Sequence, residues 1–421
     1  MKLGLLPVAI AAVVLPVLAV ACGTTADTPK PNPTPESDAG TAQDATVDLP
    51  DASDGGPAPV LTFPKAVSRG GTIIKNPKII PIVFAGETIG PKIEDFTNKL
   101  GASAYWTETA GEYGVGAIVG KPLVSYAEVP PANLTDDDIK AWLATELTKT
   151  DGPLGAPDGE TLYALFYPKA TSIDLEGTKS CQGFGGYHNE TSVGGTKVAY
   201  AVMPRCPSGG RISETDLITD VSSHEYFEWV TDPFPFTNPA FNTMDDDHWV
   251  WGVGFGGELS DLCTGLDFSG GFTPPDLPYF VQRQWSNKLS LAGHFPCAPK
   301  RDGAYFAGIP EQPDAIVVPD FSGNGNIKTK GVKMKKGESR VIDVYLYGDA
   351  PTTGPLTLQV VDSQRTGTNG FSYSLDSESA SQGEHVKVTI TATKTQDFGI
   401  FFVVARLGRQ ATIWPGLVVT Q

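Results

Sequence analysis

Residues 77–86, PKIIPIVFAG, carry the clearest strand signal in this sequence. A continuous apolar run with β-branched residues, bounded by proline and glycine, is typical of a strand buried on both faces. The next segment, Pro91–Leu100, has apolar residues three and four apart, and its proline suits the first turn of a helix. A buried strand followed by an amphipathic helix predicts a mixed α/β domain.

The alternation of helix and strand continues along the chain. Thr135–Thr148 predicts a second helix, with Thr135 as its N-cap and Asp138 three residues later. Thr161–Tyr167 and Lys197–Met203 have the composition of strands. We therefore expect an α/β domain over residues 60–308.

The C-terminal part has a different sequence pattern. Gly308–Asp314 (GIPEQPD) predicts a linker, and turn residues separate the β-type runs that follow it. These runs are Arg340–Tyr347, Leu356–Val361, Phe371–Leu375, His385–Thr393, Ile400–Ala405 and Thr412–Val419. They predict a small antiparallel β-sandwich of immunoglobulin type over residues 315–421.

The N-terminus predicts export. Residues 1–21 combine a lysine, an apolar run and small residues at the end, as a secretory signal does. Leu18–Cys22 (LAVAC) resembles a bacterial lipobox, in which the cysteine is lipidated, although an ordinary signal with an incidental cysteine is the alternative. Residues 22–59 predict a disordered acidic linker behind that anchor. We expect a bacterial envelope protein, either an outer-membrane lipoprotein tied to the membrane by its lipid or an extracellular one.

Composition excludes two classes. The net charge of −17 argues against a nucleic-acid partner, which needs a basic face to meet phosphates. The 47 glycines and 35 prolines, about one residue in five, exclude a helical bundle.

Four cysteines remain besides Cys22, an even number in an exported chain, and they predict two disulfides. Three pairings are possible. We prefer Cys181–Cys206 and Cys263–Cys297 because each closes a local loop. A four-cysteine zinc site is the alternative, but the close paired spacing of such sites is missing.

The segment with the most chemistry is Ser213–Pro233, SETDLITDVSSHEYFEWVTDP. A serine followed three residues later by Asp216 predicts a helix start. His224 and Glu228 then lie one turn apart on the same helix face, with Glu225 beside them. This is the spacing of a zinc-binding HExxH helix with glutamate in place of the second histidine, and zinc accepts both donor types. A chance helix-surface contact between His224 and Glu228 is the alternative.

A catalytic zinc needs a third protein ligand. Glu258 is our candidate, and Asp261 either orients the ligands or joins them. The run Asp245, Asp246 and Asp247 could bind Ca²⁺ or form a solvated turn. His188 is a weaker candidate, expected to line a cleft.

Six segments occur in an order that resembles the EXORDIUM-like, phosphate-induced protein 1 family. They are KIIPIVFAG, SAYWTETAGEYG, CQGFGGYHNE, VAYAVMPRC, VSSHEYFEWVTDP and GELSDLC, within Lys78–Cys297. The resemblance implies export and a zincin-like metallohydrolase site. His224, Glu225 and Glu228 match the family's helix motif, and Asp261 with Cys263 matches its loop. The family's plant growth role is not transferred, because the lipobox, acidic linker and C-terminal sandwich depart from the plant pattern.

Together these features predict a zincin-like α/β domain with a β-sandwich, acting as an exported zinc metallopeptidase. His224, Glu228 and Glu258 would bind Zn²⁺, and Glu225 would move the proton between water and the leaving amine. Lys197–Met203 would pair with an extended peptide or protein substrate. The alternative is a non-catalytic surface module that binds envelope or extracellular polymer, with HExxE as a structural or vestigial metal site.

Overall fold

The computed structural model describes residues 47–48, 60–208, 210, 212–266, 271–319, 325–363, 370–394 and 399–420. The predicted signal at residues 1–21, the lipidation at Cys22 and nearly all of the linker at 22–59 lie outside these residues. No helix in the described part of the chain has the length and apolar character needed to cross a membrane.

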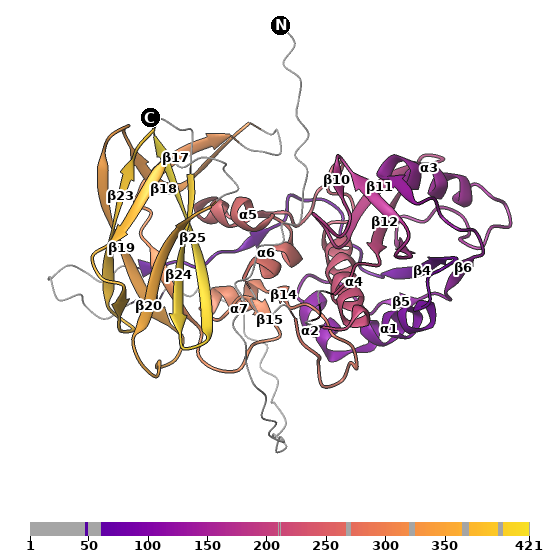
Figure 1. Cartoon of the computed structure of the whole chain (residues 1–421), viewed down its shortest axis with the longest axis horizontal. Coiled ribbons are helices and arrows are strands. Elements are labelled where there is room, and N and C mark those ends of the chain that lie inside the picture. The colour runs from indigo at the N-terminus through magenta and orange to yellow at the C-terminus, as the bar shows by residue number, and fades with distance from the viewer. Residues whose placement is uncertain are drawn as a thin grey trace, which may run out of the picture.

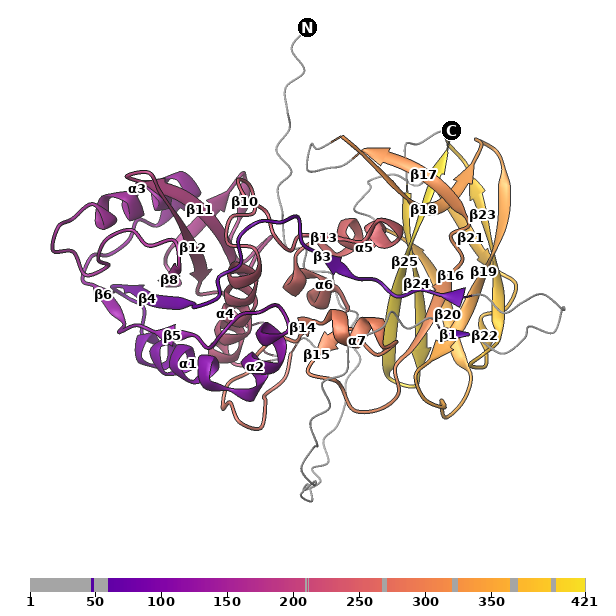
Figure 2. The same cartoon turned by 180° about the vertical axis from the view of Figure 1, so that it is seen from behind.

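A six-stranded sheet forms the centre of the N-terminal part (Figures 1 and 2). The strand order is β11-β12-β8-β4-β5, with β6 also on β4, and all neighbours are parallel except β11 and β12. The strands are β4 (Lys78–Phe84), β5 (Val119–Gly120), β6 (Val124–Tyr126), β8 (Thr161–Tyr167), β11 (Tyr187–Val193) and β12 (Thr196–Pro204). The strands predicted at 77–86, 161–167 and 197–203 are confirmed.

Helices cover both faces of this sheet (Figure 1). In β8, Leu162 and Phe166 join the apolar core beneath helices α1 and α4, whereas Tyr163 and Leu165 join the core beneath α3. This split follows from the alternation of side chains along a strand. The helices are α1 (Gly90–Ala102), α2 (Ala104–Gly111), α3 (Asp136–Leu147) and α4 (Glu214–Thr231).

Two helix starts are as predicted. Helix α1 has proline in its first turn. Helix α3 begins with a capping box, in which the Thr135 side chain accepts from the Asp138 N–H and the Asp138 carboxylate accepts from the Thr135 N–H.

The strand predicted to pair with substrate, Lys197–Met203, has no free edge for a peptide among the described residues. Strand β12 has β11 on one side and β8 on the other, so both of its edges are already paired. The edge strand is β11, which among the described residues pairs only with β12.

The C-terminal part is a two-sheet β-sandwich whose facing side chains form one apolar core. One sheet has the order β16-β19-β23-β21 and the other β17-β18-β25-β24-β20-β22. All six predicted strands are present, as β19 (Ser339–Gly348), β20 (Leu356–Asp362), β21 (Phe371–Leu375), β23 (His385–Ala392), β24 (Gly399–Leu407) and β25 (Gln410–Thr420). The sequence analysis missed β16 (Phe306–Pro310), β17 (Asp314–Pro319), β18 (Asn326–Met334) and β22 (Ser379–Ala380).

Two expectations about the sandwich need correction. Gly308–Asp314 is not simply a linker, because it contains the end of β16 and the start of β17. The sandwich is not purely antiparallel, since β18 runs parallel to β25, with Val332 opposite Val418.

Short elements join the two parts, and one of them, α6, carries Asp261 (Figure 2). Trp251 and Phe255 of helix α5 contact the sandwich residues Trp414 and Phe402, with ring centroids 4.9 and 5.4 Å apart. One apolar core therefore continues from the sandwich to the central helices. The elements here are β13 (Thr243–Met244), η1 (Asp246–His248), α5 (Trp249–Phe255), α6 (Leu259–Leu266), β14 (Gln284–Trp285), α7 (Asn287–Leu291) and β15 (Cys297–Ala298).

The predicted fold class, an α/β zincin-like domain with a small antiparallel sandwich, is wrong for this chain. The structure is mostly β, with 38% strand and 22% helix, and its described residues form seven separate sheets. The remaining small sheets use β1 (Val47–Asp48), β2 (Val60–Leu61), β3 (Ala66–Val67), β7 (Asn133–Thr135), β9 (Ser172–Leu175) and β10 (Thr178–Lys179). Strands this short have no periodic pattern, and the sequence analysis therefore passed over them.

Both preferred disulfides are present. Cys181 bonds to Cys206 and Cys263 to Cys297, with Cα atoms 5.2 and 5.8 Å apart. The bonds are compatible with an exported protein.

Candidate metal centre

Helix α4 carries the candidate residues His224 and Glu228 along one face. It starts at the predicted capping box, where Ser213 and Asp216 each satisfy the other's backbone N–H. One turn separates His224 from Glu228, and the His224 Nε2 and Glu228 Oε2 atoms are 3.2 Å apart. The predicted shared face of these two residues is confirmed.

The orientation of His224 is fixed by Gln282. His224 donates Nδ1–H to the Gln282 side-chain oxygen across 3.0 Å, and Gln282 in turn donates to the Ser260 carbonyl at 2.7 Å. An amide oxygen only accepts, so a hydrogen is on Nδ1, and Nε2 is the nitrogen that faces the acids and can bind an ion. This is the tautomer and direction that a metal-binding histidine requires.

Asp261 is the second acid facing that lone pair. Its Oδ1 atom is 3.6 Å from His224 Nε2, and its backbone N–H donates to Glu228 Oε1 at 3.1 Å. The preceding Gly256 has φ of +128°, and a Cβ atom there would be 2.3 Å from an Asp261 carboxylate oxygen. Glycine is needed at this point for the chain to turn into α6 beside the acid.

His188 reaches the same acids from the sheet. Strand alternation puts Tyr187 toward α3 and His188 toward α4. Its Nε2 donates to the Asp232 carbonyl at 3.1 Å, and its Nδ1 faces Glu225 Oε2 at 3.7 Å and Glu228 Oε2 at 3.6 Å. The sequence analysis gave His188 too little weight, and its position in a strand next to a large apolar residue was the available signal.

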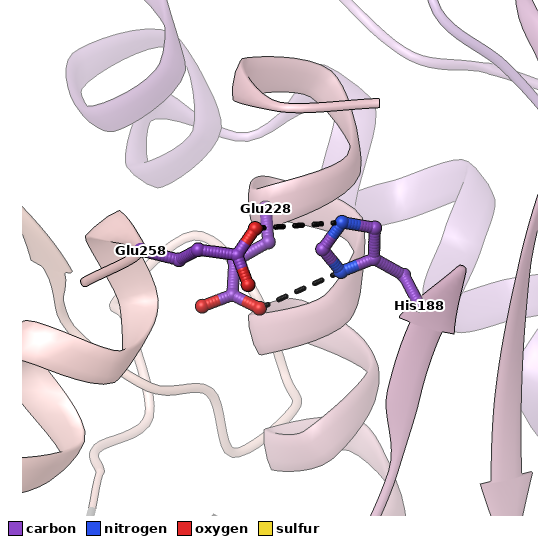
Figure 3. Close-up of side chains that lie close together, drawn as sticks. All are labelled: His188, Glu228 and Glu258. Atoms are coloured by element: carbon purple, nitrogen blue, oxygen red, sulfur yellow. Dashed lines mark ion pairs between the residues drawn. The ribbon is translucent and has the colours of Figure 1, made fainter. Parts of the chain in front are cut away.

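Glu258 faces His188 from the residue before α6 (Figure 3). Its Oε1 atom is 3.6 Å from His188 Nε2, beyond hydrogen-bond distance, and although it is buried it has no hydrogen-bond partner among the described residues. Figure 3 shows the two carboxylates on the same side of the His188 ring, with a different ring nitrogen directed at each of Glu228 and Glu258.

The acids strongly favour positive charge at both imidazoles. Burial lowers the pKa of His224, but the charge and hydrogen bond of Glu228 outweigh it and hold the pKa well above its usual value. Burial also lowers the pKa of His188, but the charge of Glu258 together with hydrogen bonds to Glu225 and Glu228 raises it well above its usual value. Burial raises the pKa of Glu228, but the two histidines bring it to about 2. Burial and the charge of Glu228 raise the pKa of Glu258 well above its usual value.

The predicted ligand set is only partly brought together. Among the described residues, two groups could hold a metal, His224 with Glu228 and Asp261, and His188 with Glu228 and Glu258. The predicted set of His224, Glu228 and Glu258 is therefore divided between them, and Glu228 belongs to both. Glu225 is buried beside His188, as the acid next to the cluster.

The first group has the spacing of zinc ligands. Atoms about 2.0–2.2 Å from one zinc ion lie roughly 3.3–3.6 Å apart in a tetrahedral arrangement. The His224 Nε2 distances of 3.2 Å to Glu228 and 3.6 Å to Asp261 agree with this. Imidazole and carboxylate donors suit zinc, so the residues fit a divalent ion.

The three acids considered as Ca²⁺ ligands, Asp245, Asp246 and Asp247, do not form a metal-binding group among the described residues. Asp245 accepts from the Lys65 and His248 backbone N–H groups and so caps the short helix η1. Asp246 and Asp247 are exposed. Neither metal-binding group of the described residues includes these three acids.

Comparisons with known proteins give partial structural matches. No family model matches the chain, and no curated protein matches it. Matching solved structures include a chimeric titin Z1Z2 carrying an exogenous decorin peptide, with 13% identity and a TM-score of 0.16, over 22% of this chain and 85% of that one. Domains 4 and 5 of the S-layer protein SbsC match with 15% identity and a TM-score of 0.16, over 28% of this chain and 76% of that one. The titin M3 domain matches with 14% identity and a TM-score of 0.15, over 22% of this chain and 88% of that one. TM-scores this low give no evidence about function.

Proposed function

We propose that this chain is an exported, zinc-dependent hydrolase that cleaves peptide bonds. One observation carries the proposal: the Nε2 atom of His224, held in place by Gln282, faces the carboxylates of Glu228 and Asp261. These three residues would hold the ion. Zinc in this position supplies Lewis acidity, which brings the pKa of water at the site toward neutrality and polarises an amide carbonyl.

Glu225 is the proposed proton carrier. It follows His224 on α4, and its carboxylate is buried next to His188. Glu225 accepts the proton of the attacking water while the water oxygen bonds to the amide carbon. It then gives that proton to the nitrogen as the carbon–nitrogen bond breaks, so that acid and amine products balance.

The side of the group nearest solvent is the side of His224. Its side chain is 13% exposed and that of Asp261 is 10% exposed, whereas Glu228 is 4% exposed. A catalytic zinc site needs one position open to water and substrate. The open edge of β11, which carries His188, could pair with an extended peptide.

The test compares Glu225→Gln with the wild-type chain. The variant should lose cleavage of a fluorogenic peptide library by 10²-fold or more, roughly the contribution of a general base, while its zinc content by elemental analysis is unchanged. Glu214→Gln changes a carboxylate at the exposed start of the same helix, and serves as the control. Wild-type cleavage rates in Glu225→Gln would reject the mechanism.

A second candidate is a non-catalytic surface module with a structural metal. The observation in its favour is burial, because the His188, Glu225 and Glu228 side chains are each 5% exposed or less. Structural zinc sites are closed in this way. Bound zinc, with no cleavage of any peptide and with polymer binding that survives chelation, would favour this candidate. We also propose that Cys22 bears the lipid that holds either form of the protein at the envelope, which mass spectrometry of the mature N-terminus would test.

A further inference from the structure

The two possible metal-binding groups share one carboxylate, that of Glu228. Glu228 Oε2 is 3.2 Å from His224 Nε2 and 3.6 Å from His188 Nδ1. Each histidine has its other nitrogen committed as a donor, to Gln282 or to the Asp232 carbonyl. Two imidazole nitrogens therefore face the same carboxylate oxygen, and positive charge, carried by bound cations or by protons on the rings, stabilises this arrangement.

Glu258 supplies an independent sign that an ion belongs next to His188. This residue is only 5% exposed, and its Oε1 atom is directed at His188 with no hydrogen-bond partner (Figure 3). Leaving a buried carboxylate oxygen unpaired is costly. A charge-assisted hydrogen bond from His188 would bring the atoms to about 2.7–2.9 Å. At the observed 3.6 Å from Nε2, which already donates to the Asp232 carbonyl, Glu258 has no such bond. One ligand atom each from His188, Glu228 and Glu258 lie within 4.8 Å of one another, close enough to surround one ion.

The charge balance also favours more than one divalent cation. Five buried carboxyl groups gather here, those of Glu225, Glu228, Asp232, Glu258 and Asp261. Within the described part of the chain, no lysine or arginine comes within 4 Å of the first four of these carboxylates. Ionised, the five acids exceed the charge of a single divalent ion by three, and two such ions reduce the excess to one. Uncompensated buried charge is costly, so two ions are the better match.

We propose that the centre is dinuclear: a second divalent transition-metal ion is bound by His188, Glu228 and Glu258, with Glu228 bridging it to the ion at His224. The proposal extends the function proposed above, because Glu228 serves both ions. Two ions that share a ligand stabilise the attacking and the leaving atoms of one displacement together.

The test counts ions without using activity. The full chain is stripped with chelator, titrated with Zn²⁺ alone and analysed after equilibrium dialysis. We expect two zinc ions per chain in the wild type and in the control Glu214→Gln. Glu258→Gln should keep one, and Asp261→Asn should keep the other. One zinc in the wild type, unchanged by Glu258→Gln, would overturn the proposal and make His188 a protonated cation instead.

A second measurement uses only the wild-type chain, so it tests the proposal even if the substituted chains do not fold. Co²⁺ titration of the wild-type chain should give an absorbance change that ends at two equivalents, and an end point at one equivalent would overturn the proposal. The test distinguishes failure of the dinuclear centre from failure of the proposed hydrolase function. Two bound ions without peptide cleavage reject only the hydrolase, whereas cleavage with one ion rejects only the second site.

Discussion

His224 and Gln282 are joined by a 3.0 Å hydrogen bond between Nδ1 and the side-chain oxygen, although 58 positions separate them in the sequence. Gln282 also donates to the Ser260 carbonyl, immediately before Asp261. A single amide thus sets both the tautomer of the histidine and the position of the loop that carries the facing acid. Partners of this kind typically change metal affinity by 10–100-fold when they are lost.

Replacing Gln282 with methionine should therefore weaken zinc binding at His224 by about 10–100-fold. Gln282→Glu should bind more tightly than Gln282→Met, because a carboxylate still accepts the Nδ1 hydrogen. Competition with a chromophoric chelator gives the dissociation constants. Gln359→Met, at an exposed position of β20, is the control. Equal zinc affinity in Gln282→Met and Gln359→Met would show that this hydrogen bond does not prepare the ligand.

Gly256→Ala tests the turn that places Asp261. Residue 256 has φ of +128°, and the new methyl group would meet the Asp261 carboxylate. We expect a loss of unfolding free energy on the order of 2 kcal/mol, with weaker zinc binding. Gly354→Ala is the matched control, since nothing lies within 4 Å of a Cβ there. Urea unfolding of both variants measures the difference, and equal midpoints would contradict the role given to Gly256.

The helix motif was predictable from the sequence because its information is local. Capping at Ser213 and the one-turn spacing of His224 and Glu228 follow from helix geometry alone. His188 was not predictable as a partner of Glu228, because the contact depends on which strand forms the edge of the sheet. The same limit applies to the division of Glu258 and Asp261 between two groups, which depends on how the glycine turn before α6 is oriented.

The fold shows the same division between local and long-range information. Long strands with clear alternation, such as β23, were predicted almost to the residue. Strand β18 was missed, although its apolar residues Val332 and Met334 belong to the sandwich core, because three lysines and a glycine interrupt its apolar pattern. Its parallel pairing with β25 is set by tertiary packing, which periodicity does not encode.

The disulfide next to the metal centre should contribute substantially to stability. Cys263 lies in α6, two residues after Asp261, and its bond to Cys297 spans 34 residues. In the chain-entropy account, closing a loop of this length contributes about 3–4 kcal/mol. Cys263→Ser with Cys297→Ser should lower the urea unfolding free energy by that order, and reduction of the wild type, which also opens Cys181–Cys206, should lower it further. An unchanged midpoint in the serine double variant would contradict this account.

The pair Asp314 and Arg340 predicts a pH dependence of stability in the sandwich. Asp314 accepts from the Arg340 guanidinium and from the Lys333 backbone N–H. Burial raises the pKa of Asp314, but these hydrogen bonds outweigh it and hold the pKa below its usual value. The folded state therefore binds this proton less tightly than the unfolded chain does. The stabilisation is fully present above the unfolded pKa of about 3.9 and is lost as the pH falls through the lower folded value.

Asp314→Asn should consequently cost about 1 kcal/mol at pH 7, the upper range for a partly exposed ion pair, and progressively less below pH 4. The difference between wild type and variant in urea unfolding at pH 7, 5 and 3 measures this, since groups at the distant metal centre affect both chains alike. Asp376→Asn is the control, because Asp376 accepts the Lys387 backbone N–H within the same sandwich. A difference for Asp314→Asn that stays constant from pH 7 to pH 3 would show that its effect does not arise from the charge of Asp314.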